Sequence, residues 1–279
     1  MFNLFRHELT SRWVAILAWG IGLTFFSALY IGVYPDMADE MSSLADLSIY
    51  QAMGIDLASF AGYIASVVVQ IMPIILGIYV IMLATGTLAG EEENGTLELI
   101  VALPLKRWQI ITMKTLAILV VIFLIMLLLG AGSAATLNAV INSADVSIDV
   151  TPMQLFMALL AVYPMMIALF GMGLFFGAFM PSRRLALVVM YTFYLASYLM
   201  SSVAGLVDSL NWLHTFSVFS YVNTTATIFS DGADIADVSI LLGIGLVFFG
   251  LAVWAFQGRN ITVGQWMWER GRIPASARS

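Results

Sequence analysis

The sequence predicts an all-α membrane protein with six transmembrane helices and both termini in the cytoplasm. Of its 279 residues, 61% are hydrophobic and only 10% are charged, and the mean hydropathy is +0.97. Six apolar segments each reach the roughly 20 residues that cross a bilayer. All Lys and Arg fall on one side of the resulting topology. The lack of cysteine excludes disulfides and thiolate metal sites, and the pI near 4.7 argues against nucleic-acid binding.

The chain begins with a short segment of mixed character. Within residues 1–12, Phe2, Phe5 and Leu9 recur at helical spacing, and charged residues fall between them. This pattern is typical of an amphipathic helix that lies in the membrane interface. A polar lead without such a helix is the alternative.

Six apolar spans follow this segment. Their expected bounds are residues 13–34, 60–88, 109–140, 153–180, 185–207 and 238–256. The second, third and fourth spans exceed the minimum length, so we expect tilt, kinks or interfacial ends. Prolines interrupt two of them, Pro73 in the second span and Pro164 in the fourth. We expect residues 1–257 to form one transmembrane domain and residues 258–279 to form a cytoplasmic tail.

The distribution of charge predicts the orientation. The loops that lack basic residues carry only acids, so the positive-inside rule places the other loops and both termini in the cytoplasm. Lys114 lies near enough to the inner end of the third span for its ammonium to reach the interface. No span has a central charged residue, which argues against a carrier driven by an ion gradient. The basic residues are Arg6, Arg12, Lys106, Arg107, Lys114, Arg183, Arg184, Arg259, Arg270, Arg272 and Arg278.

The outer loop at residues 208–237 mixes aromatic side chains with Ser, Thr and Asn. It is too apolar for a solvated linker and too broken to span the bilayer. We expect short re-entrant helices that dip into the outer leaflet and form an external lid, with a packed surface loop as the alternative. The candidate lid residues are Trp212, Phe216, Phe219 and Tyr221.

The cytoplasmic loop at residues 89–108 holds the densest run of charge in the chain. Three glutamates come first, and an Asn-Gly turn follows them. Thr96 can cap a short helix over residues 97–103, and Pro104 ends it, because the residue before a proline avoids the α conformation. A short capped helix held at the membrane surface suits docking onto a partner.

Signatures of catalysis are missing. A phosphate-binding G-x-x-x-x-G-K-[ST] loop needs a lysine after glycines, and neither Lys106 nor Lys114 has that setting. His7 and His214 fall on opposite sides of the predicted topology, so they cannot share a metal. The motifs of intramembrane proteases are also missing. We therefore expect no catalytic residue and no metal site.

Three parts of the stretch from Glu91 to Lys114 form a pattern. Residues 91–98 read Glu-Glu-Glu-Asn-Gly-Thr-Leu-Glu, residues 103–108 read Leu-Pro-Leu-Lys-Arg-Trp, and Lys114 follows near the start of the third span. It resembles the cytoplasmic loop of type-2 ABC exporter permeases, the polytopic subunits of bacterial and archaeal drug, polyketide, bacteriocin and polysaccharide exporters. The N-terminal helix, the six spans, the basic pair before the fifth span and the semi-apolar outer loop extend the resemblance over the whole chain. One departure is Val218, where the family often has proline.

The resemblance implies a half-transporter in the prokaryotic cytoplasmic membrane. Two permease chains, identical or sibling, would pair within the lipid, and two separate ATPase subunits would bind below them. Mg-ATP would belong to the ATPases, and this chain would hold no cofactor. The helix from Thr96 to Leu103 would be the coupling helix, seated in a groove of the ATPase. The implied coupling residues are Glu91, Glu92, Glu93, Gly95, Thr96, Leu97, Glu98, Pro104 and Arg107.

The same resemblance implies that the second and fifth spans line a central path. Its polar candidates are Gln70, Thr85, Tyr194 and Ser197. The expected cargo is a hydrophobic or amphipathic molecule, such as a drug, an antibiotic or a lipid-like compound. A non-transporting scaffold or immunity protein is the first alternative, and a secondary carrier is the second.

Overall fold

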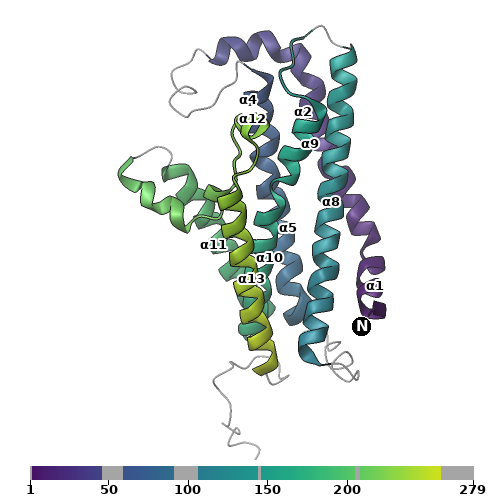
Figure 1. Ribbon diagram of the computed structural model, residues 1–279, viewed down its shortest axis with the longest axis vertical. Coiled ribbons are helices and arrows are strands. Elements are labelled where there is room, and N and C mark those ends of the chain that lie inside the picture. The colour runs from purple at the N-terminus through teal and green to yellow at the C-terminus, as the bar shows by residue number, and fades with distance from the viewer. Residues whose placement is uncertain (1, 46–58, 91–105, 144–145, 205–207, 259–279) are drawn as a thin grey trace, which may run out of the picture.

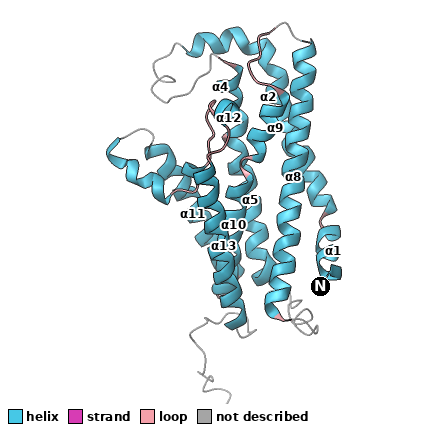
Figure 2. Cartoon of the chain, in the orientation of Figure 1, coloured by secondary structure: helices cyan, strands magenta, loops and turns pink. Residues whose placement is uncertain are grey.

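A computed structural model describes residues 2–45, 59–90, 106–143, 146–204 and 208–258. These residues form helices joined by turns and loops, with no strand among them (Figure 2). Six segments are long and apolar enough to cross a membrane, which confirms the predicted all-α, six-span class. They are Trp13–Ala38, Phe60–Gly90, Arg107–Ser143, Pro152–Phe179, Arg183–Val203 and Ile235–Gly258.

The expected N-terminal helix is present as α1 (Phe2–Ser11). It packs along the beginning of α8 (Arg107–Ser143). The first span belongs to α2 (Trp13–Ala45), which runs through Pro35 and therefore continues past the expected end of the span. Polar contacts inside the bundle join α2 to α8, since the Ser133 hydroxyl donates to that of Ser27 over 2.8 Å.

The second span is built from four consecutive pieces. They are α4 (Phe60–Ile64), the π-helical η1 (Ala65–Val69), α5 (Ile71–Thr85) and the π-helical η2 (Gly86–Gly90). Pro73 has no N–H to give to the carbonyl of Val69, so the α-helical ladder is interrupted near this point. The wider turn of η1 appears in the bond from the Gln70 N–H to the Ala65 carbonyl, 2.9 Å long.

The fourth span is broken as the sequence predicts. Pro164 cannot donate to the carbonyl of Leu160, and the helix divides into α9 (Pro152–Leu160) and α10 (Tyr163–Phe179). A capping box between Thr151 and Gln154 starts α9.

The fifth and sixth spans enclose the outer loop. They are α11 (Arg183–Ala204) and α13 (Ile235–Gly258). Between them lie the short helices η3 (Asp208–Phe216), η4 (Phe219–Tyr221) and α12 (Ile228–Asp231). The end of α11 and η3 project from the side of the bundle in Figure 1, so the loop does contain the short helices that its composition predicts.

Glycines let α10 pack closely against two neighbours at once. A Cβ added to Gly171 would come within 2.6 Å of the Gly245 carbonyl oxygen on α13. On the side of α5, a Cβ at Gly177 would come within 3.1 Å of the Thr85 carbonyl oxygen. Small residues at such contacts are the usual means of close helix approach in membranes. The helix α10 is thereby fixed between α5 and α13, which are also its neighbours in Figure 1.

Candidate functional site

Most of the predicted coupling residues lie outside the described residues. They are Glu91, Glu92, Glu93, Gly95, Thr96, Leu97, Glu98 and Pro104. The flanks of this loop are described, and they end at Gly90 on the second span and begin again at Lys106 before the third. Both flanks lie at the end of the bundle that also carries α1, the start of α11 and the end of α13; we call this the basic end (Figure 1).

Arg107, the described member of the coupling set, ties the third span to the sixth. Its Nη1 donates to the carbonyl of Phe256 over 3.1 Å, near the end of α13. The guanidinium carbon also stands 5.8 Å from the centre of the Phe256 ring. Arginine near a helix C-terminus satisfies carbonyls that have no partner in the helix. The start of the third span is therefore attached to the end of α13.

Arg183 makes the matching attachment on the other flank. Its Nη2 donates to the carbonyl of Met82 over 3.4 Å. A Cβ added to Gly86 would approach that nitrogen to 3.0 Å, so the π-helical end of the second span accommodates the arginine. The sequence indicated the basic pair before the fifth span as a signal of orientation and as part of the family resemblance, but not as an attachment to the second span. Gly86 and Gly90, at the two ends of η2, were the sequence signal for a side chain packed closely against this helix.

A buried charge cluster joins α1 to the third span. Arg12 Nη2 lies 2.7 Å from Glu8 Oε1, and Lys114 Nζ lies 3.5 Å from Glu8 Oε2. Lys114 is 1% exposed, because Glu8 on the docked α1 supplies its counter-charge inside the packing; that its ammonium reaches the interface stays a prediction. Burial alone would raise the pKa of the Glu8 carboxyl, but Lys114 and Arg12 outweigh it and lower that pKa.

A pocket of about 390 Å³ lies between α5 and α11, which belong to the second and fifth spans. Tyrosines dominate its wall on the side of α11. Its lining residues are Ile74, Ile78, Tyr191, Tyr194, Leu195, Tyr198 and Phe219. These lining residues are uncharged, and four of them carry aromatic rings.

Tyr194 is the member of the predicted path set that lines this pocket. Its hydroxyl donates to the Pro73 carbonyl over 2.6 Å, at the place where Pro73 disturbs the ladder of the second span. Gly77 leaves the room for it, since an added Cβ would collide with the tyrosine hydroxyl. The Tyr194 side chain therefore joins the second span to the fifth.

The other path candidates lie elsewhere. The Thr85 hydroxyl is buried and donates to the carbonyl of Ile81 on its own helix over 2.8 Å. Ser197 is buried against the outer loop, and Gln70 is half-buried. Their part in a path remains a prediction.

Ser197 anchors a turn of the outer loop. Its hydroxyl lies 3.1 Å from that of Ser217 and accepts from the backbone N–H of Val218 over 2.8 Å. A proline at 218 could not give this bond, so the departure from the family pattern has a structural use. The turn seats the Phe219 ring 5.0 Å from that of Tyr194.

The remaining lid candidates divide by exposure. Trp212 and Phe216 are 60% and 63% exposed, and their rings meet edge to face at 6.1 Å. Tyr221 is half-buried and donates from its hydroxyl to the Thr215 carbonyl over 2.9 Å. Exposed aromatic rings suit a membrane–water boundary. Whether the group forms a lid remains a prediction.

Within the described ranges there is no group of three or more His, Cys, Asp or Glu side chains that could hold a metal. The described charged residues that are buried are Glu8 and Lys114. The described residues that flank positions 91–105 carry contacts between different spans, and an apolar pocket lies between α5 and α11.

Two comparisons bear on this arrangement. The family model described as "ABC-2 family transporter protein" matches residues 2–261. A comparison with curated proteins gives no match.

Proposed function

Because the chain belongs to the ABC-2 family of transporter proteins, we propose that it is the permease subunit of an ATP-driven exporter in a prokaryotic cytoplasmic membrane. Its cargo is a hydrophobic or amphipathic molecule that leaves the cytoplasm or the inner leaflet. ATP with Mg²⁺ is hydrolysed on a separate ATPase, and this chain performs no chemistry. Two ATPases and a second permease chain, identical or sibling, complete the transporter.

The pair of attachments that flank the cytoplasmic loop carries this proposal. Arg183 fastens the end of the second span to the start of the fifth, and Arg107 fastens the start of the third to the end of the sixth. A force applied to residues 91–105 therefore reaches four spans through these two contacts. Closure of the ATPases around bound ATP supplies that force, and the bundle changes from inward-open to outward-open.

The pocket between α5 and α11 supports the proposed class of cargo. Its wall holds aliphatic and tyrosine side chains and no charged group. Such a wall favours apolar ligands and leaves a few hydroxyls to orient them. A charged solute would lose its hydration there without a partner.

Reversing one charge in the loop is expected to uncouple the transporter. The chain is co-purified with its ATPase and reconstituted in lipid vesicles, and ATP hydrolysis is measured with and without the permease. We expect Glu93→Lys to reduce the permease-dependent part of the hydrolysis by about tenfold or more, since a carboxylate that pairs with a basic groove is worth a few kcal/mol at a desolvated contact. Asp231→Lys is the matched control, because that exposed acid lies at the opposite end of the bundle.

Hydrolysis that is unchanged by Glu93→Lys, with normal co-purification, counts against the proposal. The two alternatives give their own results. A scaffold or immunity protein keeps its phenotype when the ATPase gene is deleted. A secondary carrier moves cargo in ATP-free vesicles under an ion gradient.

A further inference from the structure

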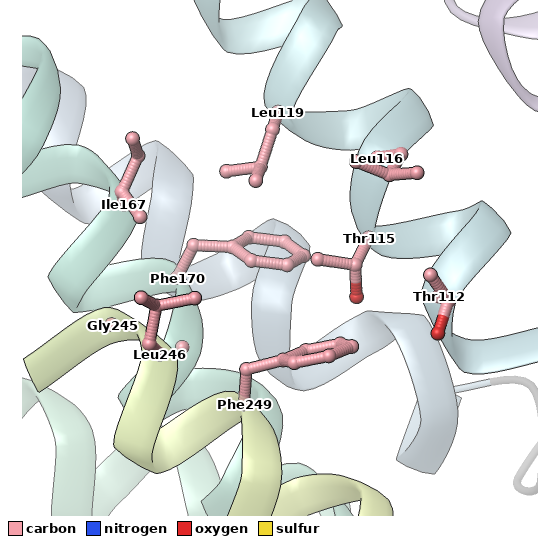
Figure 3. A pocket seen from close by; sticks show the side chains of 10 residues that line it. Thr112, Thr115, Leu116, Leu119, Ile167, Phe170, Gly245, Leu246 and Phe249 are labelled. Carbon is pink, nitrogen blue, oxygen red and sulfur yellow. The ribbon is translucent and has the colours of Figure 1, made fainter. Parts of the chain in front are cut away.

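A second pocket lies on the other side of α10, away from the α5–α11 surface. It has a volume of about 160 Å³ and is walled by α8, α10 and α13 (Figure 3). Phe170 and Phe249 supply rings, and Leu116, Leu119 and Leu246 supply aliphatic side chains. The residues that line the α5–α11 pocket form no part of it. A ligand of this pocket is therefore distinct from cargo in the α5–α11 pocket.

The pocket contains a hydroxyl that has no partner. Thr115 is 7% exposed, and its Oγ1 is a buried polar atom without a hydrogen bond among the described residues. Two other threonines of the same helix donate to a carbonyl one turn earlier, Thr112 to Trp108 over 2.7 Å and Thr136 to Gly132 over 2.9 Å. In Figure 3 the Thr115 oxygen points into the space beside Phe249.

The unbonded hydroxyl has a free-energy cost. A hydroxyl that is removed from water and left without a hydrogen bond destabilises the folded protein. A threonine in a membrane helix usually donates its hydroxyl to a carbonyl of its own helix. The Thr115 hydroxyl makes no such bond. An acceptor atom brought by a ligand removes the penalty, and the other walls of the pocket require that ligand to be apolar.

The mouth of the pocket opens at the outer surface of the bundle. Leu116 is 46% exposed and Leu246 is 70% exposed in the single chain, and we take this apolar surface of membrane-spanning helices to face lipid. Trp108, exposed near the start of α8, marks the level of the head groups. Thr115 is seven residues farther along and thus about 10 Å deeper. The interface is about 5–7 Å thick on each side, so Thr115 lies just inside the hydrocarbon boundary, close to the level of the ester carbonyls.

We infer that this pocket binds one acyl chain of a phospholipid from the leaflet at the basic end, with the ester carbonyl accepting a hydrogen bond from Thr115. A cavity of similar size holds a benzene ring, so the pocket takes the carbonyl and the first methylenes, and the rest of the chain passes out between Leu116 and Leu246. The bound lipid fills the space between α8, α10 and α13 and thereby supports their packing.

Ester and ether lipids of equal chain length test the inference. The purified full-length chain is transferred to detergent, and binding of diester and diether phosphatidylglycerol is compared by native mass spectrometry. We expect the diester lipid to bind about fivefold more tightly, as one added hydrogen bond allows. The preference should vanish in Thr115→Val and persist in Thr115→Ser. Thr112→Val is the matched control, because the Thr112 hydroxyl already has an acceptor.

Equal affinity of the unaltered chain for both lipids overturns the inference, and so does an ester preference that survives in Thr115→Val. Thermal melts of each variant show that it is folded. Binding of a small aromatic probe such as phenol, with no ester preference, assigns the pocket to another class of ligand. None of these outcomes depends on ATP hydrolysis or on the identity of the cargo, so they are independent of the proposed function.

Discussion

Replacing Lys114 with alanine is expected to lower the free energy of unfolding by about 3 kcal/mol, among the largest effects of any single change in this chain. The lysine ammonium is the buried counter-charge of Glu8 and lies 3.5 Å from its carboxylate. Without it, the carboxylate stays inside the packing between α1 and α8 with Arg12 alone. The expected consequence is that α1 detaches from the bundle before the rest unfolds.

Chemical denaturation in mixed micelles measures the loss. Lys106→Ala is the matched control, because Lys106 is exposed one residue before α8 and should have little effect. The pH dependence supplies a second readout. The folded state lowers the pKa of Glu8, so the stabilisation by this carboxylate is present above its ordinary pKa and is lost as pH falls through the lowered value. Equal stability of Lys114→Ala and Lys106→Ala would contradict the role of the cluster.

Adding a single methyl group to Gly171 is expected to destabilise the bundle by about 2 kcal/mol or more. The new Cβ would stand 2.6 Å from the Gly245 carbonyl oxygen and 3.1 Å from the Gly245 Cα. Both are backbone atoms of α13, so no side chain can move aside, and the two helices have to separate. Since α10 also contacts α5, the change reaches the centre of the fold.

Gly250→Ala provides the comparison for this change. Its added Cβ meets no atom within 4 Å, so only the better helix propensity of alanine remains, and the melting temperature should stay level or rise slightly. The two purified variants are compared in the same detergent by thermal melting. A Gly171→Ala protein as stable as Gly250→Ala would show that α10 and α13 are not in close contact.

The six spans could be predicted from the sequence because the signal for each one lies within its own residues. Apolar length predicts a membrane helix whatever its neighbours are, and Pro164 alone accounts for the break between α9 and α10. The amphipathic pattern of residues 1–12 likewise predicts α1. The common side of the basic residues also indicated which helix ends share a surface.

Contacts between residues far apart in the chain could not be predicted from the sequence. Glu8 and Lys114 are 106 positions apart, and periodicity says nothing of which helix lies opposite which. The sequence also does not show in which direction a hydroxyl points. Thr85, a path candidate, bonds to its own helix. Thr115, which is not among the candidates, faces a pocket and has no hydrogen-bond partner among the described residues. Both are threonines in apolar spans, and only the packing distinguishes them.

The side of the membrane on which residues 91–105 lie tests the account most directly. The chain has no cysteine, so Asn94→Cys and Ser230→Cys each introduce one thiol, the first in the loop and the second in α12 at the opposite end of the bundle. The account predicts that a membrane-impermeant maleimide labels Ser230→Cys in intact cells, but labels Asn94→Cys only in inverted vesicles, and then only until the ATPase binds. Labelling of Asn94→Cys from outside intact cells, or labelling that the bound ATPase does not protect, would contradict it.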